Sequence, residues 1–271
     1  MRRFFSFVLL VAALAAAMAA LTGCSALGGA DRSWDKVKEK GELVMGLDDS
    51  FPPMGFRDEN NELTGFDVDV AKEVCNRLGI KLRLQQIVWD TKEQELNTGN
   101  IDCIWNGFTI TEERKENVLF TEPYMGNRQV LVVKSDSTLS KLSDFEGKRL
   151  ALQAGSSAAD ALNAAVDFKS KLKEVVEFDE NLTALMDLEK GGVDVVLMDE
   201  VVANYNISTG KFDIKVLDEA LAPEEYGIGF RKNDVALMNK VQDTLKSMAK
   251  DGKLAEISEK WFGKDVTTIG K

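Results

Sequence analysis

An apolar segment followed by a group of polar residues occupies the region Gly99–Arg114, whose sequence is GNIDCIWNGFTITEER. The segment Ile101–Trp105 is short and mostly apolar, which predicts a strand of an α/β sheet. A guanidinium close to hydroxyl and backbone groups can bind a carboxylate through charge-assisted hydrogen bonds. Four residues beyond the predicted strand carry groups of this kind: Asn106, Gly107, Thr109 and Arg114.

Polar residues also follow three other predicted strands. Because open α/β sheets bind ligands beyond the carboxyl ends of their strands, these residues are candidates for the same site. Two of the strand ends come from each half of the chain, so we expect the ligand between two lobes. The three strands are Leu43–Leu47 before Asp48 and Asp49, Arg149–Leu152 before Gly155, Ser156 and Ser157, and Val193–Met198 before Asp199.

Arg114 lies in the first turn of a predicted helix, since Thr111 is a natural N-cap. A basic residue at that place opposes the helix dipole, which would favour an acid. Pairing of Arg114 with a ligand carboxylate would explain its position. An ordinary solvent-exposed arginine would explain it equally well.

Ser157 and Asp199 likewise have two interpretations each. The segment from Gly155 to Ser157 precedes a predicted helix whose first N–H groups could bind an anion, although a serine N-cap explains the same residues. Asp199 could neutralise a cation in the same cleft, or it could cap the helix that runs through Ala203.

Two aromatic residues, Phe51 and Trp89, lie on predicted loops beside the polar strand ends. Most aromatic residues belong to the core, but two on such loops could hold a ligand side chain between their rings. A guanidinium, an anion-binding helix start, an opposed aspartate and two aromatic rings together fit the two charges of a free amino acid.

Strands and helices alternate along both halves of the chain, which predicts an α/β fold with a mostly parallel sheet in each of two lobes. The helix Phe66–Leu78 should end at Gly79, and the strand Ile80–Leu84 should be half-buried because its residues alternate. The same pattern starts again after Gln129. Further elements are expected at Val130–Val133, Val175–Phe178, Tyr226–Phe230 and Val235–Ala249, with a last helix that includes Trp261 and Phe262.

The N-terminal sequence has the pattern of an export signal. Arg2 and Arg3 precede the apolar run Phe4–Leu21, which ends in a lipobox, LTGC. An uncleaved transmembrane anchor is the alternative, although the run of about 18 residues is shorter than the roughly 20 that span a bilayer. The expected segments are a lipoprotein signal peptide at residues 1–23, a lipid attachment site that carries palmitate at Cys24, and a tether at residues 24–32.

Composition excludes several classes of function. The formal net charge is −11, and an acidic surface without a basic patch repels nucleic acid. The chain contains no histidine, which removes the usual general base at neutral pH and most zinc sites. We therefore expect no catalytic residue, no metal and no cofactor. Cys75 and Cys103 lack metal-ligand spacing and are either buried free thiols or a disulfide.

Several longer motifs resemble the extracellular solute-binding proteins of the polar amino-acid family, which deliver ligands to ABC importers. The resemblance covers residues 31–263. It is carried by GLDDSFPPMGF (Gly46–Phe56), LTGFDVDVAKEV (Leu63–Val74), the run Gly99–Arg114, FTEPY (Phe120–Tyr124), MDEV (Met198–Val201), YGIGFRK (Tyr226–Lys232) and KWFG (Lys260–Gly263).

This resemblance implies a two-lobed, periplasmic-binding-protein-like fold of type II, whose lobes close on the ligand. The chain would cross between the lobes near residues 125–129 and 221–225, which gives one lobe of residues 31–126 plus 223–271 and another of residues 127–222. It also implies an exported monomer, either periplasmic or held on the outer face of the bacterial membrane by its lipid alone. Its partners would be a free amino acid, a permease and an ATPase.

The resemblance assigns roles to the candidate residues. Arg114 would pair with the ligand α-carboxylate, helped by Ser157 and Thr109. The α-ammonium would be received by Asp199, the Gly107 carbonyl and the Thr109 hydroxyl. Phe51 and Trp89 would be the two aromatic plates, and Asp48 would meet a nitrogen of the ligand side chain. Trp105 and Asn106 stand where relatives usually have small residues, so the resemblance does not determine the size of the pocket.

An enzyme on the same scaffold is the main alternative, because related folds can host dehydratase activity on carboxylated rings. It would need a general acid with a raised pKa, for which Asp48, Asp49 and Glu122 are candidates. An amino-acid sensor or adhesion ectodomain is the third possibility. Within the transport hypothesis, Asp48, Asp49 and Asn106 favour a polar uncharged or basic ligand over an acidic one.

Overall fold

The computed structural model describes residues 31–271, and its contacts divide the chain into the units Met1–Arg32 and Ser33–Lys271. The predicted signal peptide, the lipid site at Cys24 and most of the tether lie outside the described residues. Within residues 31–271, no helix combines the length and the apolar character that crossing a membrane requires.

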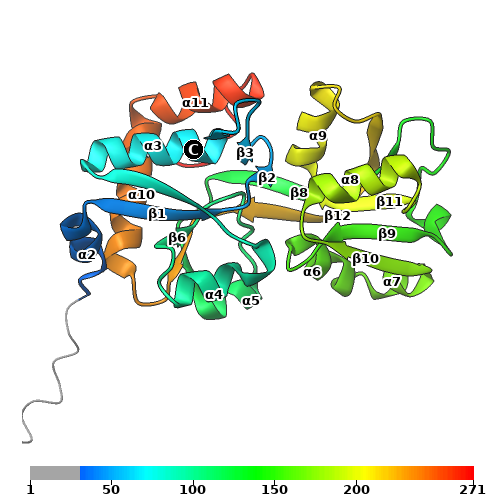
Figure 1. The fold of residues 1–271 in the computed structure, drawn as a ribbon, viewed down its shortest axis with the longest axis horizontal. Coiled ribbons are helices and arrows are strands. Elements are labelled where there is room, and N and C mark those ends of the chain that lie inside the picture. The colour runs from blue at the N-terminus through cyan, green and yellow to red at the C-terminus, as the bar shows by residue number, and fades with distance from the viewer. Residues whose placement is uncertain (1–30) are drawn as a thin grey trace, which may run out of the picture. The chain divides into compact units, whose positions relative to one another are not determined.

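Two five-stranded sheets organise the unit Ser33–Lys271 (Figure 1). In the first, β1 (Glu42–Leu47) lies between β5 (Lys81–Gln86) and β6 (Cys103–Ile104) and is parallel to both. The sheet is completed by β13 (Gly229–Arg231), which is antiparallel to both β6 and β7 (Val118–Phe120). We call this sheet and its helices the first lobe. Its helices are α2 (Ser33–Lys40), α3 (Phe66–Leu78), α4 (Lys92–Asn97), α5 (Glu112–Asn117), α10 (Val235–Lys250) and α11 (Lys253–Phe262), with the 3-10 turn η1 (Trp89–Thr91) and the small sheet β2 (Ser50–Phe51), β3 (Gly55–Arg57) and β4 (Leu63–Thr64).

The second sheet has the order β10-β9-β11-β8-β12. Strand β9 (Arg149–Gln153) is parallel to β10 (Glu174–Phe178) and to β11 (Val195–Asp199), whereas β8 is antiparallel to both of its neighbours, β11 and β12. This sheet and its helices form the second lobe. Its remaining elements are β8 (Met125–Lys134), β12 (Ile214–Tyr226), α6 (Ser157–Ala164), α7 (Val166–Lys171), α8 (Asn181–Lys190), α9 (Glu200–Ser208) and the 3-10 turn η2 (Leu142–Phe145).

The chain passes between the lobes along two paired strands, β8 and β12 (Figure 1). They are antiparallel, and their pairing places Met125 opposite Tyr226, after which the chain enters β13 of the first sheet. The predicted two-lobed α/β fold with helices beside mostly parallel sheets is therefore confirmed.

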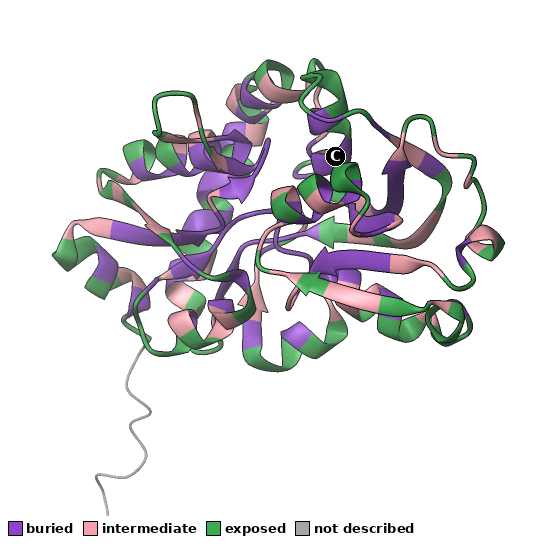
Figure 2. Cartoon of the chain, turned by 45° about the vertical axis from the view of Figure 1, so that its right-hand side comes forward, coloured by how far each residue is buried: buried purple, intermediate pink, exposed green. Residues whose placement is uncertain are grey.

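Buried residues are concentrated in the central strands of both sheets, whereas the edge strands β5 and β10 contain none and exposed residues lie on the outer helix faces (Figure 2). Strand β1 is buried from Leu43 to Leu47 because elements cover both of its faces, which is why its sequence reads as a continuous apolar run. Helix α3 has the predicted bounds, and Gly79 ends it in the left-handed conformation with φ +68°. Cys75 and Cys103 are both buried and free, so the disulfide alternative is wrong.

Strand β12 was not predicted. Its sequence, IKVLDEALAPEEY, contains charges and Pro223, which weaken the strand signal. The structure shows why these residues are tolerated: β12 lies at the edge of its sheet, pairs with β8 alone, and has register shifts between Val216 and Ala222. The predicted strand Ile101–Trp105 is in turn reduced to the two residues of β6.

Candidate functional site

The four predicted strand ends lie at matching edges of the two sheets. In the first lobe, β1 and β6 are parallel neighbours, so Asp48 and Asn106 follow strands that end at the same edge. In the second lobe, β9 and β11 are also parallel neighbours. Gly155, just after β9, and Asp199, at the end of β11, therefore lie at the same edge of the second sheet. Sheet topology thus brings the predicted polar residues together in the manner expected for open α/β sheets.

Arg114 is buried and faces the second lobe. Thr111 caps α5 by accepting a hydrogen bond from the backbone N–H of Arg114 at 3.1 Å, as predicted. The Arg114 guanidinium donates to the carbonyl of Thr109 at 2.9 Å and to that of Gly155, across the lobes, at 3.3 Å. Its carbon Cζ lies 4.8 Å from the ring centre of Phe108. With 6% of its surface exposed, Arg114 is not the ordinary surface arginine of the alternative interpretation.

A second buried cation, Lys92 of α4, lies at the same end of the site. Its Nζ donates to the Gly155 carbonyl at 2.7 Å and lies 5.4 Å from the ring centre of Trp89. Burial, reinforced by the charge of Arg114, lowers the pKa of Lys92 to about 8. Two cations therefore converge on one carbonyl oxygen and repel each other. A pocket of about 200 Å³ opens beside them.

Asp199 is buried at the opposite end of the site. It is the N-cap residue of α9 by position, but its side chain makes no capping hydrogen bond. Instead, its Oδ1 accepts hydrogen bonds from the Tyr226 hydroxyl at 2.6 Å and from Asn127 Nδ2 at 2.7 Å. Burial, with the nearby carboxylate of Glu224, raises the pKa of Asp199 to about 7. Asp199 therefore lies at the predicted N-cap position, but its side chain bonds other residues of the site and does not cap the helix.

Thr109 joins the two charged ends. Its carbonyl accepts from Arg114, while its hydroxyl lies 3.1 Å from Ser157 Oγ and donates to Glu224 Oε2 at 3.2 Å. Asn127 Nδ2 bridges Glu224 Oε2, at 2.9 Å, to Asp199. A continuous series of hydrogen bonds thus connects Arg114 of the first lobe with Asp199 of the second.

Asp48 forms another contact between the lobes. Its carboxylate accepts from Gln153 Nε2 at 2.7 Å and from the backbone N–H of Ser50 at 2.8 Å. Nearby, the Ser50 hydroxyl donates to Glu180 at 3.0 Å. Burial raises the pKa of Asp48 to about 6, although both accepted hydrogen bonds oppose this. The lobes are therefore in contact at both Asp48 and Gly155.

Ser156 does not cap α6 through its side chain. Its hydroxyl donates to the Gln153 carbonyl at 2.7 Å, which stabilises the turn between β9 and α6. Ser157 is buried, and its hydroxyl accepts from Gln129 Nε2 at 3.2 Å. The serine N-cap interpretation is therefore wrong for both residues.

The remaining predicted residues surround the loop after β6. Gly107 has φ +55°, and a Cβ atom there would lie 2.9 Å from the ring of Phe51, so this position requires glycine. Trp89 packs edge-on against Phe108 with ring centres 5.8 Å apart. Phe51 and Trp89 belong to separate core clusters. The Asn106 amide is buried, and neither of its polar atoms has a hydrogen-bond partner among the described residues.

Five polar residues of the site were missed by the sequence analysis. Three lie on the predicted crossings, where alternate residues of an extended segment share a face, and this pattern could have identified them. Another ends β9 one residue later than predicted. The lysine gave no signal, because lysine is rarely buried. They are Asn127, Gln129, Glu224, Gln153 and Lys92.

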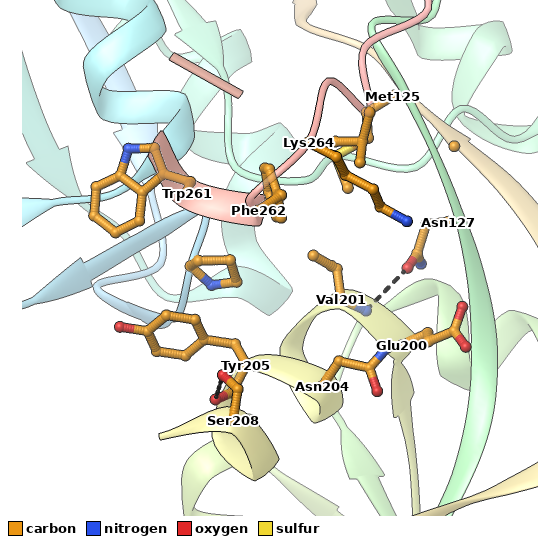
Figure 3. A pocket seen from close by; sticks show the side chains of 13 residues that line it. Met125, Asn127, Glu200, Val201, Asn204, Tyr205, Ser208, Trp261, Phe262 and Lys264 are labelled. Carbon is orange, nitrogen blue, oxygen red and sulfur yellow. Dashed lines mark hydrogen bonds between the residues drawn. The ribbon is translucent and has the colours of Figure 1, made fainter. Parts of the chain in front are cut away.

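Another pocket, of about 420 Å³, lies between α9, the start of β8 and the C-terminal part of the chain, and Asn127 of the site also lines it (Figure 3). Tyr205, Trp261 and Phe262 line it together with the charged residues Glu200 and Lys264. It contains none of the sequence-predicted site residues.

The loop after β6 is held by a buried carboxylate that the sequence analysis did not identify. Asp67, in the first turn of α3, accepts from the Gly107 N–H at 2.7 Å and from the Tyr124 hydroxyl at 3.0 Å. It has no exposed surface, and burial raises its pKa to about 7. Asp67 therefore fixes the backbone on which Asn106 and Thr109 stand.

A fold of two α/β lobes joined by two strands, with oppositely charged groups buried between the lobes, defines a protein that encloses a small charged ligand. The chain belongs to the bacterial extracellular solute-binding proteins, family 3, whose family model matches residues 43–264.

Relatives and solved structures agree with this assignment. The chain is 34% identical to the L-cystine-binding protein of Escherichia coli over 93% of this chain and 94% of that protein. It is 40% identical to an ABC uptake transporter substrate binding protein from Streptococcus pneumoniae with bound histidine, with a TM-score of 0.85 over 88% and 99% of the two chains. It is also similar to an ancestral amino acid-binding protein described as a precursor of cyclohexadienyl dehydratase, at 34% identity and a TM-score of 0.77 over 84% and 98% of the two chains.

We predict that Asp67→Asn reduces the pH dependence of stability. The pKa of Asp67 lies near 7 in the folded chain against an ordinary value of 3.8, so the folded chain retains a proton that the unfolded chain releases between these values. This contribution is present below pH 4 and is lost as the pH rises to 7. From pH 5 to 7 the wild type should lose about 2 kcal/mol more unfolding free energy than the variant. Urea unfolding at several pH values measures this.

The control for this experiment is Glu59→Gln, which changes an exposed carboxylate in the turn between β3 and β4. Its stability should follow the wild-type curve. Parallel curves for the wild type and Asp67→Asn would contradict the prediction.

Proposed function

We propose that this chain captures a free amino acid between its two lobes and delivers it to an ABC importer, and that it is not an enzyme. The observation that carries the proposal is the series of hydrogen bonds through Thr109, which joins a buried guanidinium to a buried carboxylate across the lobes. The relatives named above, which bind cystine and histidine, support the same conclusion.

The charges at the two ends match those of an α-amino acid. Arg114 and Lys92 form a cationic end, and a ligand carboxylate there would offset their repulsion. Arg114 keeps further N–H donors beside the two that contact backbone carbonyls, and these can bind the ligand carboxylate. At the other end, Asp199, the Gly107 carbonyl and the Thr109 hydroxyl would receive the ammonium group.

The ligand side chain would lie toward Asp48, Asn106, Phe51 and Trp89. Asp48 is a buried acceptor, and the Asn106 amide has both unpaired acceptor and donor atoms. These groups can hydrogen-bond a polar or basic side chain, whereas Asp48 would repel an acidic one. We therefore propose a polar uncharged or basic L-amino acid as the ligand.

Capture requires the two lobes to open and close about β8 and β12. The proposed moving parts are residues 31–126 plus 223–271 on one side and residues 127–222 on the other. The polar contacts between the lobes are compatible with this motion, because each joins one side chain of a lobe to a small number of groups on the other lobe. Gly155 receives Lys92 and Arg114, and Asp48 receives Gln153. Opening would break these polar contacts, together with those of Ser50 with Glu180 and of Thr109 with Ser157, and would leave each sheet intact.

Among the candidate acids named from the sequence for a cleft enzyme, Asp48 is the one with a raised pKa. Its two accepted hydrogen bonds, from Gln153 and Ser50, hold the carboxylate in place as an acceptor rather than as a free acid. A binding role explains the same carboxylate without any chemical step, since a ligand nitrogen can replace Gln153 as donor.

We predict that Arg114→Ala weakens amino-acid binding by about 2 to 5 kcal/mol, because the ligand carboxylate would remain buried without its partner. Titration calorimetry with the tightest-binding amino acid measures the change. Lys115→Ala is the matched control, since this neighbouring side chain is exposed and pairs only with Glu112 in an ion pair. A change below about threefold, or ~0.65 kcal/mol, in Arg114→Ala would contradict the role.

The affinity should fall as the pH falls below about 7. The ammonium group favours ionised Asp199, whose pKa is about 7, so binding at lower pH must release a proton. The groups that face Asp199 are Tyr226, Asn127, Gln129, Glu224 and Arg114.

Calorimetry from pH 8 to 5.5 should show a loss that approaches tenfold per pH unit for this group. Asp199→Asn should bind more weakly, with a flatter profile. Equal slopes for the wild type and the variant would assign the pH dependence to another group.

We further propose that Cys24 carries a lipid that anchors the exported chain, as a monomer, to the outer face of the membrane. The lipobox and the family assignment support this. Cys24→Ser, expressed in a bacterium that processes lipoproteins, should lose labelling by palmitate and move from the membrane fraction to the soluble fraction. A Cys24→Ser chain that stays in the membrane fraction would favour the uncleaved anchor instead.

A further inference from the structure

Glu224, on the crossing strand β12, is a partly buried residue of the site. A single oxygen, Oε2, accepts hydrogen bonds from Thr109 Oγ1 at 3.2 Å, Asn127 Nδ2 at 2.9 Å and Gln129 Nε2 at 3.0 Å. These donors belong to the loop after β6 and to β8, the other crossing strand. Glu224 therefore connects the hinge with the predicted ammonium end of the site.

Asn127 holds the carboxylates of Glu224 and Asp199 next to each other. Its Nδ2 donates to both, at 2.9 and 2.7 Å. Its Oδ1 accepts from the backbone N–H of Val201 at the start of α9, as Figure 3 shows, which fixes the orientation of the amide. Two carboxylates thus lie side by side at this end of the site and share one amide donor.

The hydroxyl groups nearby can only act as acceptors toward a ligand at this end. Because the Thr109 hydroxyl donates its one proton to Glu224, the contact between Thr109 and Ser157 must have Ser157 as the donor. Gln129 Nε2 in turn donates to Ser157 Oγ at 3.2 Å. Each hydroxyl proton is thus used within the protein, and a lone pair of Thr109 Oγ1 remains.

A further acceptor is buried in the same place. Gln129 has no exposed surface, and its Oε1 has no hydrogen-bond partner among the described residues. A buried amide oxygen without a donor is unfavourable, and a ligand with several N–H groups would correct this. A primary ammonium supplies three donors and the positive charge that two neighbouring carboxylates require.

We propose that Glu224 is a second ammonium-binding carboxylate, which acts with Asp199 and makes the site select ligands that carry a free α-ammonium group. This inference rests on the proposed function. The arrangement also gives the ligand a direct contact with the hinge, since Glu224 and Gln129 lie on the two crossing strands.

Glu224→Gln tests the proposal, because it keeps the shape and an acceptor oxygen but removes the charge. Each proteinogenic L-amino acid and L-cystine are first screened by thermal shift, and the tightest binder is titrated by calorimetry alongside the corresponding acid in which hydrogen replaces the amino group. Glu224→Gln should lose at least about tenfold in affinity for the amino acid and little for the des-amino acid. Glu225→Gln is the matched control, an exposed carboxylate next in sequence whose backbone carbonyl, not its side chain, accepts from Ile110.

Two results would overturn the proposal: amino-acid binding by Glu224→Gln within about twofold of the wild type, or equal losses for the amino acid and the des-amino acid. Should Glu224→Gln not fold, a crystal structure of the wild-type complex decides. The ligand nitrogen should lie within about 3.2 Å of a Glu224 carboxylate oxygen, and a nitrogen bound by Asp199 alone overturns the proposal. Absence of any amino-acid binding by the wild type would instead refute the proposed function and this inference with it.

Discussion

Charges of opposite sign, buried or partly buried at the two ends of Thr109, are the constraint on which the rest of the site depends. Arg114 and Lys92 lie at one end, and Asp199 and Glu224 lie at the other. At each end, burial shifts the pKa of a charged group toward neutrality, and a neighbouring like charge adds to the shift, as for Lys92 and Asp199. A zwitterion relieves both ends at once, because its carboxylate and its ammonium are a fixed short distance apart.

The fold provides this arrangement through sheet topology. Parallel neighbours place their carboxyl ends at one edge, so β1 with β6 and β9 with β11 each deliver polar residues to the same place. The crossing strands add Asn127, Gln129 and Glu224 between these edges. The strands that connect the lobes therefore also hold acceptors of the site, which would couple the proposed lobe movement to ligand binding.

Much of this could be predicted from sequence, because the signals were local. The bounds of α3 follow from its apolar spacing and Gly79, and the burial of β1 follows from its continuous apolar run. Arg114, Thr109, Ser157 and Asp199 were identified because they follow strands, and the structure brings them together.

The rest depended on contacts between distant residues. Whether Arg114 and Asp199 were surface or capping residues could be decided only by burial and by their partners, which are distant in sequence. Strand β12 was missed because its charges and Pro223 are compatible with a strand only at a sheet edge. Lys92 was missed because its partner, the carbonyl of Gly155, belongs to the other lobe.

Gly155 links the close contact between the lobes to the burial of the two cations. Its φ of +62° favours glycine, and a Cβ atom there would lie 2.9 Å from Cα of Asp90 in the first lobe, a backbone atom that cannot rotate away. A side chain at this position would therefore hold the lobes apart. The same residue presents its carbonyl oxygen to both Lys92 and Arg114. The lobes can approach closely enough to bury two cations only because Gly155 lacks a side chain, and those cations are tolerated there because its backbone supplies the acceptor.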